Sequence, residues 1–186
     1  MKLRFFPALT VGALIIMAAS CTRQSAVNST SPAIPSETKA NLAATLTQTA
    51  PLPHLNLDEQ GRALRGYDPV AYFVENTAVM GSAEFTFEWE GAIWQFTSAE
   101  NRNLFASAPA DYAPANGGYC TFGVVLAKKF DGDPNTWLLH DGQLYVFLNP
   151  EVKDKFLQDE SGNLAKVNSN WPRIRDKTPA ELEQLG

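Results

Sequence analysis

Two β-hairpin patterns constrain the fold more than any other feature of this chain. In the first, residues 84–89 and 92–96 alternate polar and apolar side chains on either side of a Glu-Gly turn. In the second, residues 136–140 and 143–148 flank Asp141-Gly142, a dipeptide that accommodates the positive φ angles of a tight turn. We therefore predict two antiparallel strand pairs.

A helix pattern follows each hairpin. Ser98 is a typical N-cap for a helix over residues 99–105, and Pro109 is expected to end it. Three further helices are predicted at residues 150–157, 164–174 and 179–185. Because strands and helices are mixed without regular alternation, we expect a small α+β domain with two β-hairpins and several short helices.

The N-terminal residues resemble an export signal. Lys2 and Arg4 precede an apolar run at residues 9–17, which is too short to span a membrane, so residues 1–20 are expected to be a signal peptide. The small residues before Cys21 resemble a bacterial lipobox and predict lipidation of that cysteine, although Ala18 replaces its usual leucine. The alternative is ordinary signal-peptidase cleavage, which leaves Cys21 unmodified.

The expected location follows from this leader. A threonine rather than an aspartate comes after Cys21, which by resemblance favours an outer-membrane lipoprotein that faces the periplasm of the bacterial cell envelope. The lipid would then be the contact with the membrane, and a protein partner in the envelope is a further expectation. Under either cleavage, the domain lies outside the cytoplasm.

Composition divides the remaining chain into a tether and a domain. Residues 21–54 are rich in Ser, Thr, Ala and Pro with few large apolar residues, so they are expected to form a flexible tether. Residues 55–186 contain all four tryptophans and are long enough for a single domain. The net charge of −5, with Lys128-Lys129 as the longest basic cluster, argues against nucleic-acid binding.

Several spaced motifs resemble the YHS-domain family. They are residues 66–73 (GYDPVAYF), 94–98 (WQFTS), 105–112 and 117–120 (GGYC), in that order. Together they span nearly the whole domain and are most similar to the exported branch of the family. The resemblance implies a YHS-like fold and a soft-metal ligand such as copper. Metal-associated members have cysteines at three positions that are different residues here, namely Ala71, Thr97 and Asn101.

The resemblance and the residues together indicate four candidate site residues. Cys120, beside Tyr119, is the expected metal ligand, since two preceding glycines allow close approach and a following helix would favour the thiolate. The alternative is a buried structural cysteine. Tyr67 and Asp68 are candidate ligand-binding residues; the alternative is that Asp68 caps a helix and the aromatic side chains pack in the core.

Three functions remain open from the sequence. The first is an envelope-anchored module that binds a small ligand, specifically a copper-type soft metal, through Cys120. The second is a thiol redox protein or sensor acting through a mixed disulfide at Cys120, and the third is a structural or interaction module without a small ligand. Whether the chain is an enzyme is undecided, but a binding module is favoured, because no Ser-His-Asp order, phosphate-binding glycine loop or paired carboxylates stand out.

Overall fold

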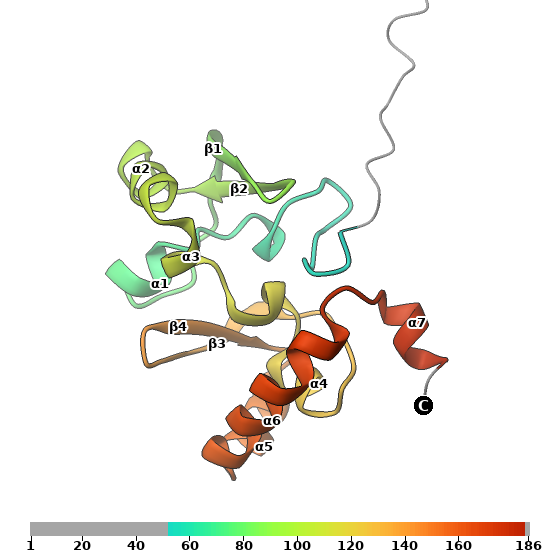
Figure 1. The fold of residues 1–186 in the computed structure, drawn as a ribbon. Coiled ribbons are helices and arrows are strands. Elements are labelled where there is room, and N and C mark those ends of the chain that lie inside the picture. The colour runs from blue at the N-terminus through green and yellow to red at the C-terminus, as the bar shows by residue number, and fades with distance from the viewer. Residues whose placement is uncertain (1–51, 185–186) are drawn as a thin grey trace, which may run out of the picture. The chain divides into compact units, whose positions relative to one another are not determined.

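Both predicted hairpins form, and the fold is mixed α+β as expected. The structure is a computed structural model that describes residues 52–184. Within this range it has seven α-helices, two short 3-10 helices and two separate two-stranded antiparallel sheets (Figure 1). The helices are η2 (Leu64–Gly66), α1 (Ala71–Val74), α2 (Ala99–Ser107), α3 (Pro109–Tyr112), η3 (Ala115–Gly118), α4 (Thr121–Val125), α5 (Pro150–Leu157), α6 (Glu160–Ile174) and α7 (Pro179–Glu183).

The first hairpin joins β1 (Ser82–Trp89) to β2 (Ala92–Phe96). Its turn residues both have positive φ, 52° at Glu90 and 78° at Gly91, as a tight hairpin turn requires. The second joins β3 (Asp133–His140) to β4 (Gln143–Phe147) through Asp141-Gly142. Strand β3 begins three residues before the predicted start, beyond a register shift that the local pattern conceals.

The helix ends follow the capping chemistry of the sequence. Ser98 accepts a hydrogen bond of 3.1 Å from the Asn101 amide and so caps α2. Pro109 does more than end α2, because it also begins α3, where its fixed φ suits the first turn. Asn149 caps α5 through a 2.9 Å hydrogen bond from the Val152 amide.

Two groups of buried side chains lie on the two faces of strand β4. Leu144 and Val146 belong to what we call the aromatic cluster, which centres on Phe105, whereas Phe147 belongs to the helical cluster formed with α4 to α7. Residues that alternate along a strand point to opposite faces, so β4 joins both clusters. Figure 1 shows the corresponding arrangement, with α2 beside β1 and α4 beside α6.

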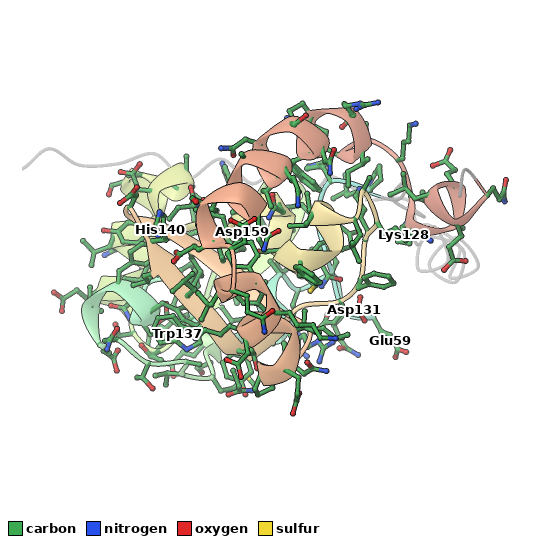
Figure 2. All side chains as sticks on the ribbon, turned by 90° about the horizontal axis from the view of Figure 1, so that it is seen from below. Glu59, Lys128, Asp131, Trp137, His140 and Asp159 are labelled. Atoms are coloured by element: carbon green, nitrogen blue, oxygen red, sulfur yellow. The ribbon has the colours of Figure 1, made fainter. Side chains whose placement is uncertain are left out.

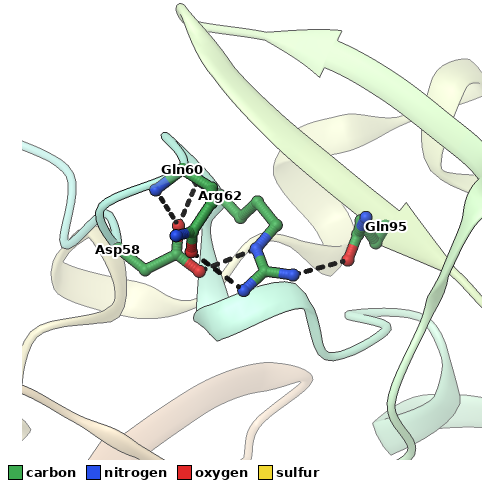
Figure 3. Close-up of polar contacts among 4 residues, drawn as sticks. All are labelled: Asp58, Gln60, Arg62 and Gln95. Atoms are coloured by element: carbon green, nitrogen blue, oxygen red, sulfur yellow. Dashed lines mark hydrogen bonds and ion pairs between the residues drawn. The ribbon is translucent and has the colours of Figure 1, made fainter.

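The segment before η2 contains an ion pair whose arginine also contacts the first hairpin (Figure 3). The Asp58 carboxylate accepts hydrogen bonds from the Arg62 amide at 2.9 Å and the Arg62 Nε at 2.7 Å, and Arg62 also donates to Gln95 of β2. Burial alone would raise the pKa of Asp58, but the hydrogen bonds from Arg62 and Gln60 outweigh it and lower that pKa. This segment is therefore part of the folded unit.

Candidate functional site

Cys120 lies inside the helical cluster. Its side chain is 1% exposed, and its Sγ accepts a 3.2 Å hydrogen bond from the Leu148 amide. The residue precedes α4 as predicted, but this helix has only five residues and the thiol packs in the same cluster as Val124 and Phe156. A ligand could reach the sulfur only if the surrounding helices moved, so the geometry favours the structural interpretation of Cys120.

The two glycines before Tyr119 accommodate another segment of the same chain. A Cβ added at Gly117 would lie 1.8 Å from the His54 carbonyl oxygen, and Gly117 and Gly118 have φ of 61° and 81°. Asn56 donates hydrogen bonds to both glycine carbonyls, at 2.8 Å from its amide and 3.2 Å from its side chain. The close approach that the glycines permit is thus made by the backbone around His54.

Tyr119 belongs to a structural contact that we call the lysine clasp. Its hydroxyl donates to the Leu55 carbonyl at 3.1 Å, and its ring centroid lies 4.9 Å from the Lys129 ammonium, which also lies 5.2 Å from the ring centroid of Trp171. Burial lowers the pKa of Lys129 to about 8 and raises the pKa of Tyr119. The ammonium donates to three backbone carbonyls, those of Pro53, Arg175 and Lys177.

The Asp68 carboxylate is completely buried and hydrogen-bonded at both oxygens. Oδ1 accepts from the amides of Val70 at 2.8 Å and Ala71 at 3.3 Å, at the start of α1. Oδ2 accepts from the Thr97 amide and hydroxyl, each at 2.8 Å, and from the Asn101 side chain at 2.7 Å. With five donors around it, this carboxylate ties α1 to the start of α2 and offers no oxygen to an external ligand.

Ala71, Thr97 and Asn101, the three positions noted in the predicted YHS resemblance, therefore meet around one carboxylate. Each donates a backbone or side-chain N–H to Asp68, although they come from segments about 30 residues apart in the sequence. The sequence alone did not indicate this network, because its donors are ordinary polar groups. The three positions thus surround the Asp68 carboxylate, to which each of them donates a hydrogen bond.

Tyr67 and Cys120 do not share a site with this carboxylate. The Tyr67 hydroxyl accepts a 3.1 Å hydrogen bond from the Asn135 side chain on β3, whereas Cys120 faces the helical cluster. The ring nitrogens of His140 are each paired, Nδ1 with Glu160 at 2.7 Å and Nε2 with Asp141 at 3.3 Å. Within residues 52–184, no group of three or more His, Cys, Asp or Glu side chains is arranged to hold a metal ion.

A cleft of about 210 Å³ lies beside Gly117, and we call it the tryptophan cleft. Three of the four tryptophans of the chain line it, Trp89, Trp94 and Trp171. Trp94 is 1% exposed and donates its indole N–H to the Trp89 carbonyl at 3.2 Å, so it forms a fixed wall. Trp89 and Trp171 are half-buried and present part of their indole surface to the cleft.

Charged side chains stand at the edge of this cleft. His54 Nε2 lies 3.7 Å from the carboxylate of Glu90, the residue in the β1–β2 turn. Arg175, just after α6, also lines the cleft, with its side chain half exposed and its Nε 3.4 Å from Asp176. The cleft therefore combines indole surfaces with a guanidinium group and with one carboxylate, Glu90, which lies next to His54. The indole surfaces and the guanidinium together suit a ring that bears a negative charge.

Comparisons with protein-family models, with curated proteins and with solved structures found no match to this chain. The YHS resemblance accordingly stays a prediction from the motifs. Among residues 52–184, no helix is both long and apolar enough to cross a membrane. Cys21, the predicted lipidation site, lies outside the described residues.

Proposed function

We propose that the domain binds a small ring-shaped organic anion in the tryptophan cleft. The observation that supports this most directly is the meeting of three tryptophans, from β1, β2 and α6, at one cleft with Arg175 at its edge. Binding sites for small molecules are concave and mostly apolar or aromatic, with a few polar groups that fix orientation. The tryptophan cleft is concave and has aromatic walls with polar side chains at its edge.

The size and charge of the cleft define the class of ligand. Drug-sized ligands occupy pockets of roughly 300–1,000 Å³. A volume of about 210 Å³ is smaller and suits a single ring. Indole faces pack against ring faces, and the Arg175 guanidinium has N–H donors besides the Nε that lies near Asp176, so it can donate to a carboxylate. Sugar carboxylates and aromatic carboxylates both satisfy these requirements.

Calorimetric titration of the full chain tests the proposal. Glucuronate and benzoate serve as the two ring carboxylates, and methyl glucoside serves as the neutral ring. We expect one of the carboxylates to bind, and Arg175→Gln to weaken that binding about tenfold, since one exposed charge-assisted contact contributes roughly 1.4 kcal/mol. The matched control is Arg102→Gln, because Arg102 is a partly exposed arginine of α2 that does not line the cleft.

Two results would contradict the proposal. One is that neither carboxylate binds the folded chain. The other is that Arg175→Gln and Arg102→Gln bind the carboxylate equally well, which would mean that the Arg175 guanidinium does not contact the ligand.

The soft-metal and thiol-redox functions predicted for Cys120 need a different state of the protein. Both require an accessible thiolate, whereas the described thiol is 1% exposed and accepts an amide hydrogen bond. A Cu(I) titration under reducing conditions, comparing the wild type with Cys120→Ser, separates these functions from ligand binding in the cleft. Loss of Cu(I) binding in the variant would support the metal function.

The proposed location is the bacterial cell envelope, with the chain anchored through a lipid on Cys21. It is supported by the signal-like leader and the small residues before that cysteine. Cys21→Ser should move the protein from the membrane fraction to the soluble periplasmic fraction. Retention of the variant in the membrane fraction after removal of its leader would contradict a lipid anchor at this residue.

A further inference from the structure

A second cavity, of about 330 Å³, lies where the loop after α4 meets α6 and α7, and we call it the basic groove. Its apolar lining includes Leu126, Ile174 and Leu182. Leu126 is 55% exposed, so part of this apolar lining is open to solvent. Asn170 fixes one wall, because its side-chain amide donates to two carbonyls at the end of α4.

Every ionisable residue that lines this groove is basic. Lys128 lies on the loop after α4, where Figure 2 labels it, and Arg173 and Lys177 come from the end of α6 and the loop beyond it. None of the three forms an ion pair with any residue in the described part of the chain. In a chain with a net charge of −5, such a local excess of cations favours an anionic partner.

Asp176 and Glu181, which adjoin the groove residues Lys177 and Leu182 in the sequence, have partners of their own. Asp176 pairs with Arg175, and the Glu181 carboxylate accepts hydrogen bonds from the amide and hydroxyl of Thr178 at 2.7 and 2.8 Å. Lys177 contributes to lowering the pKa of Glu181, after these Thr178 hydrogen bonds. Glu181 thus offsets part of the charge of Lys177, but Lys128 and Arg173 keep the groove cationic.

We propose that the basic groove binds a single-chain amphiphilic anion, namely an acyl chain that ends in a carboxylate. The acyl chain would cover Leu126 and the apolar wall, and the carboxylate would contact Lys128 and Arg173. This pairing of an aliphatic wall with basic side chains matches such a molecule on both counts. The site is separate from the tryptophan cleft, since the two cavities have no lining residue in common.

Calorimetric titration of the full chain with decanoate, below the concentration at which decanoate forms micelles, tests this inference. We expect saturable binding, at least tenfold weaker binding of hexanoate, and at least tenfold weaker binding of decanol. The double variant Lys128→Gln/Arg173→Gln should also bind decanoate at least tenfold more weakly. Lys166→Gln, at an exposed lysine of α6 that does not line the groove, should bind it like the wild type.

Three outcomes would overturn the inference. They are the absence of saturable decanoate binding to the folded chain, equal affinities for decanoate and decanol, and equal affinities of the double variant and Lys166→Gln. Because all these substitutions are on the surface, thermal melting should show that each variant folds. If no ring carboxylate bound in the tryptophan cleft, the decanoate result would be unaffected, because this titration uses neither the ring carboxylates nor the Arg175 variant.

Discussion

Replacing Asp68 by alanine removes the acceptor on which two distant segments converge. The variant leaves the amides of Val70 and Thr97 and the side chain of Asn101 without their partner, at donor–acceptor distances that were 2.7–2.8 Å. Each buried donor left unsatisfied costs about 1–3 kcal/mol. Three such donors give a sum of roughly 3–9 kcal/mol, and a water molecule entering the vacated space would recover part of it.

We therefore expect Asp68→Ala to lower the free energy of unfolding by about 4 kcal/mol, a large share of the roughly 5–15 kcal/mol that stabilises a typical domain. Asp68→Asn should lower the free energy of unfolding nearly as much, because the asparagine NH₂ group would face hydrogen-bond donors where the aspartate has an acceptor oxygen. Urea unfolding followed by tryptophan fluorescence measures both values. Asp154→Ala, an exposed aspartate within α5, is the matched control and should change stability by less than about 0.5 kcal/mol.

A loss of less than about 1 kcal/mol in Asp68→Ala, with an unchanged dependence on urea, would refute this reasoning. It would mean that the five hydrogen bonds to this carboxylate do not hold α1 against the start of α2. The same result in Asp154→Ala and Asp68→Ala would place Asp68 among ordinary surface aspartates.

Three further predictions concern the lysine clasp, Gly117 and the Cys120 thiol. Burial lowers the pKa of Lys129 from 10.5 to about 8, so between these pH values the unfolded chain keeps a proton that the folded chain has released. The free energy of unfolding of the wild type, relative to that of Lys129→Met, should therefore rise from pH 8 to pH 9.5 in urea titrations. A constant difference between the two proteins would contradict the lowered pKa. Gly117→Ala should lower the free energy of unfolding by roughly 2 kcal/mol or more beyond the effect of Gly142→Ala. Both substitutions strain a positive φ, but only the Cβ at Gly117 also clashes with backbone, since a Cβ at Gly142 meets nothing within 4 Å. Equal melting temperatures of the two variants would contradict the close packing of Gly117 on His54. Iodoacetamide should label Cys120 about a hundredfold more slowly in the folded than in the unfolded chain, as mass spectrometry of its peptide can measure, and comparable rates would show an accessible thiol.

The parts of the fold that sequence predicts well are those encoded by neighbouring residues. Asp141-Gly142 predicts a hairpin because the geometry of the turn depends on these two residues alone. Ser98 predicts a helix start because its side chain accepts a hydrogen bond from the amide only three residues further along the chain. The start of β3 was predicted three residues late because a register shift interrupts its alternation.

The candidate site was harder to predict, because its residues meet only in the tertiary structure. His54, Glu90 and Arg175 are separated by at least 36 positions, and no local period links them. The sequence places all four tryptophans in the domain, but no local pattern shows which of them meet in the fold. The glycines before Cys120 indicated a close approach, yet the sequence could not show that His54 makes it.

Indole N–H signals in a ¹H–¹⁵N spectrum of the full chain test ligand binding in the tryptophan cleft most directly. The chain has four tryptophans, of which Trp137 does not line the cleft and so serves as an internal control. Titration with the ring carboxylate that binds should shift the Trp89 and Trp171 signals and leave the Trp137 signal in place. Saturable binding without a shift of Trp89 or Trp171, or with a shift of Trp137 alone, would contradict the proposed site.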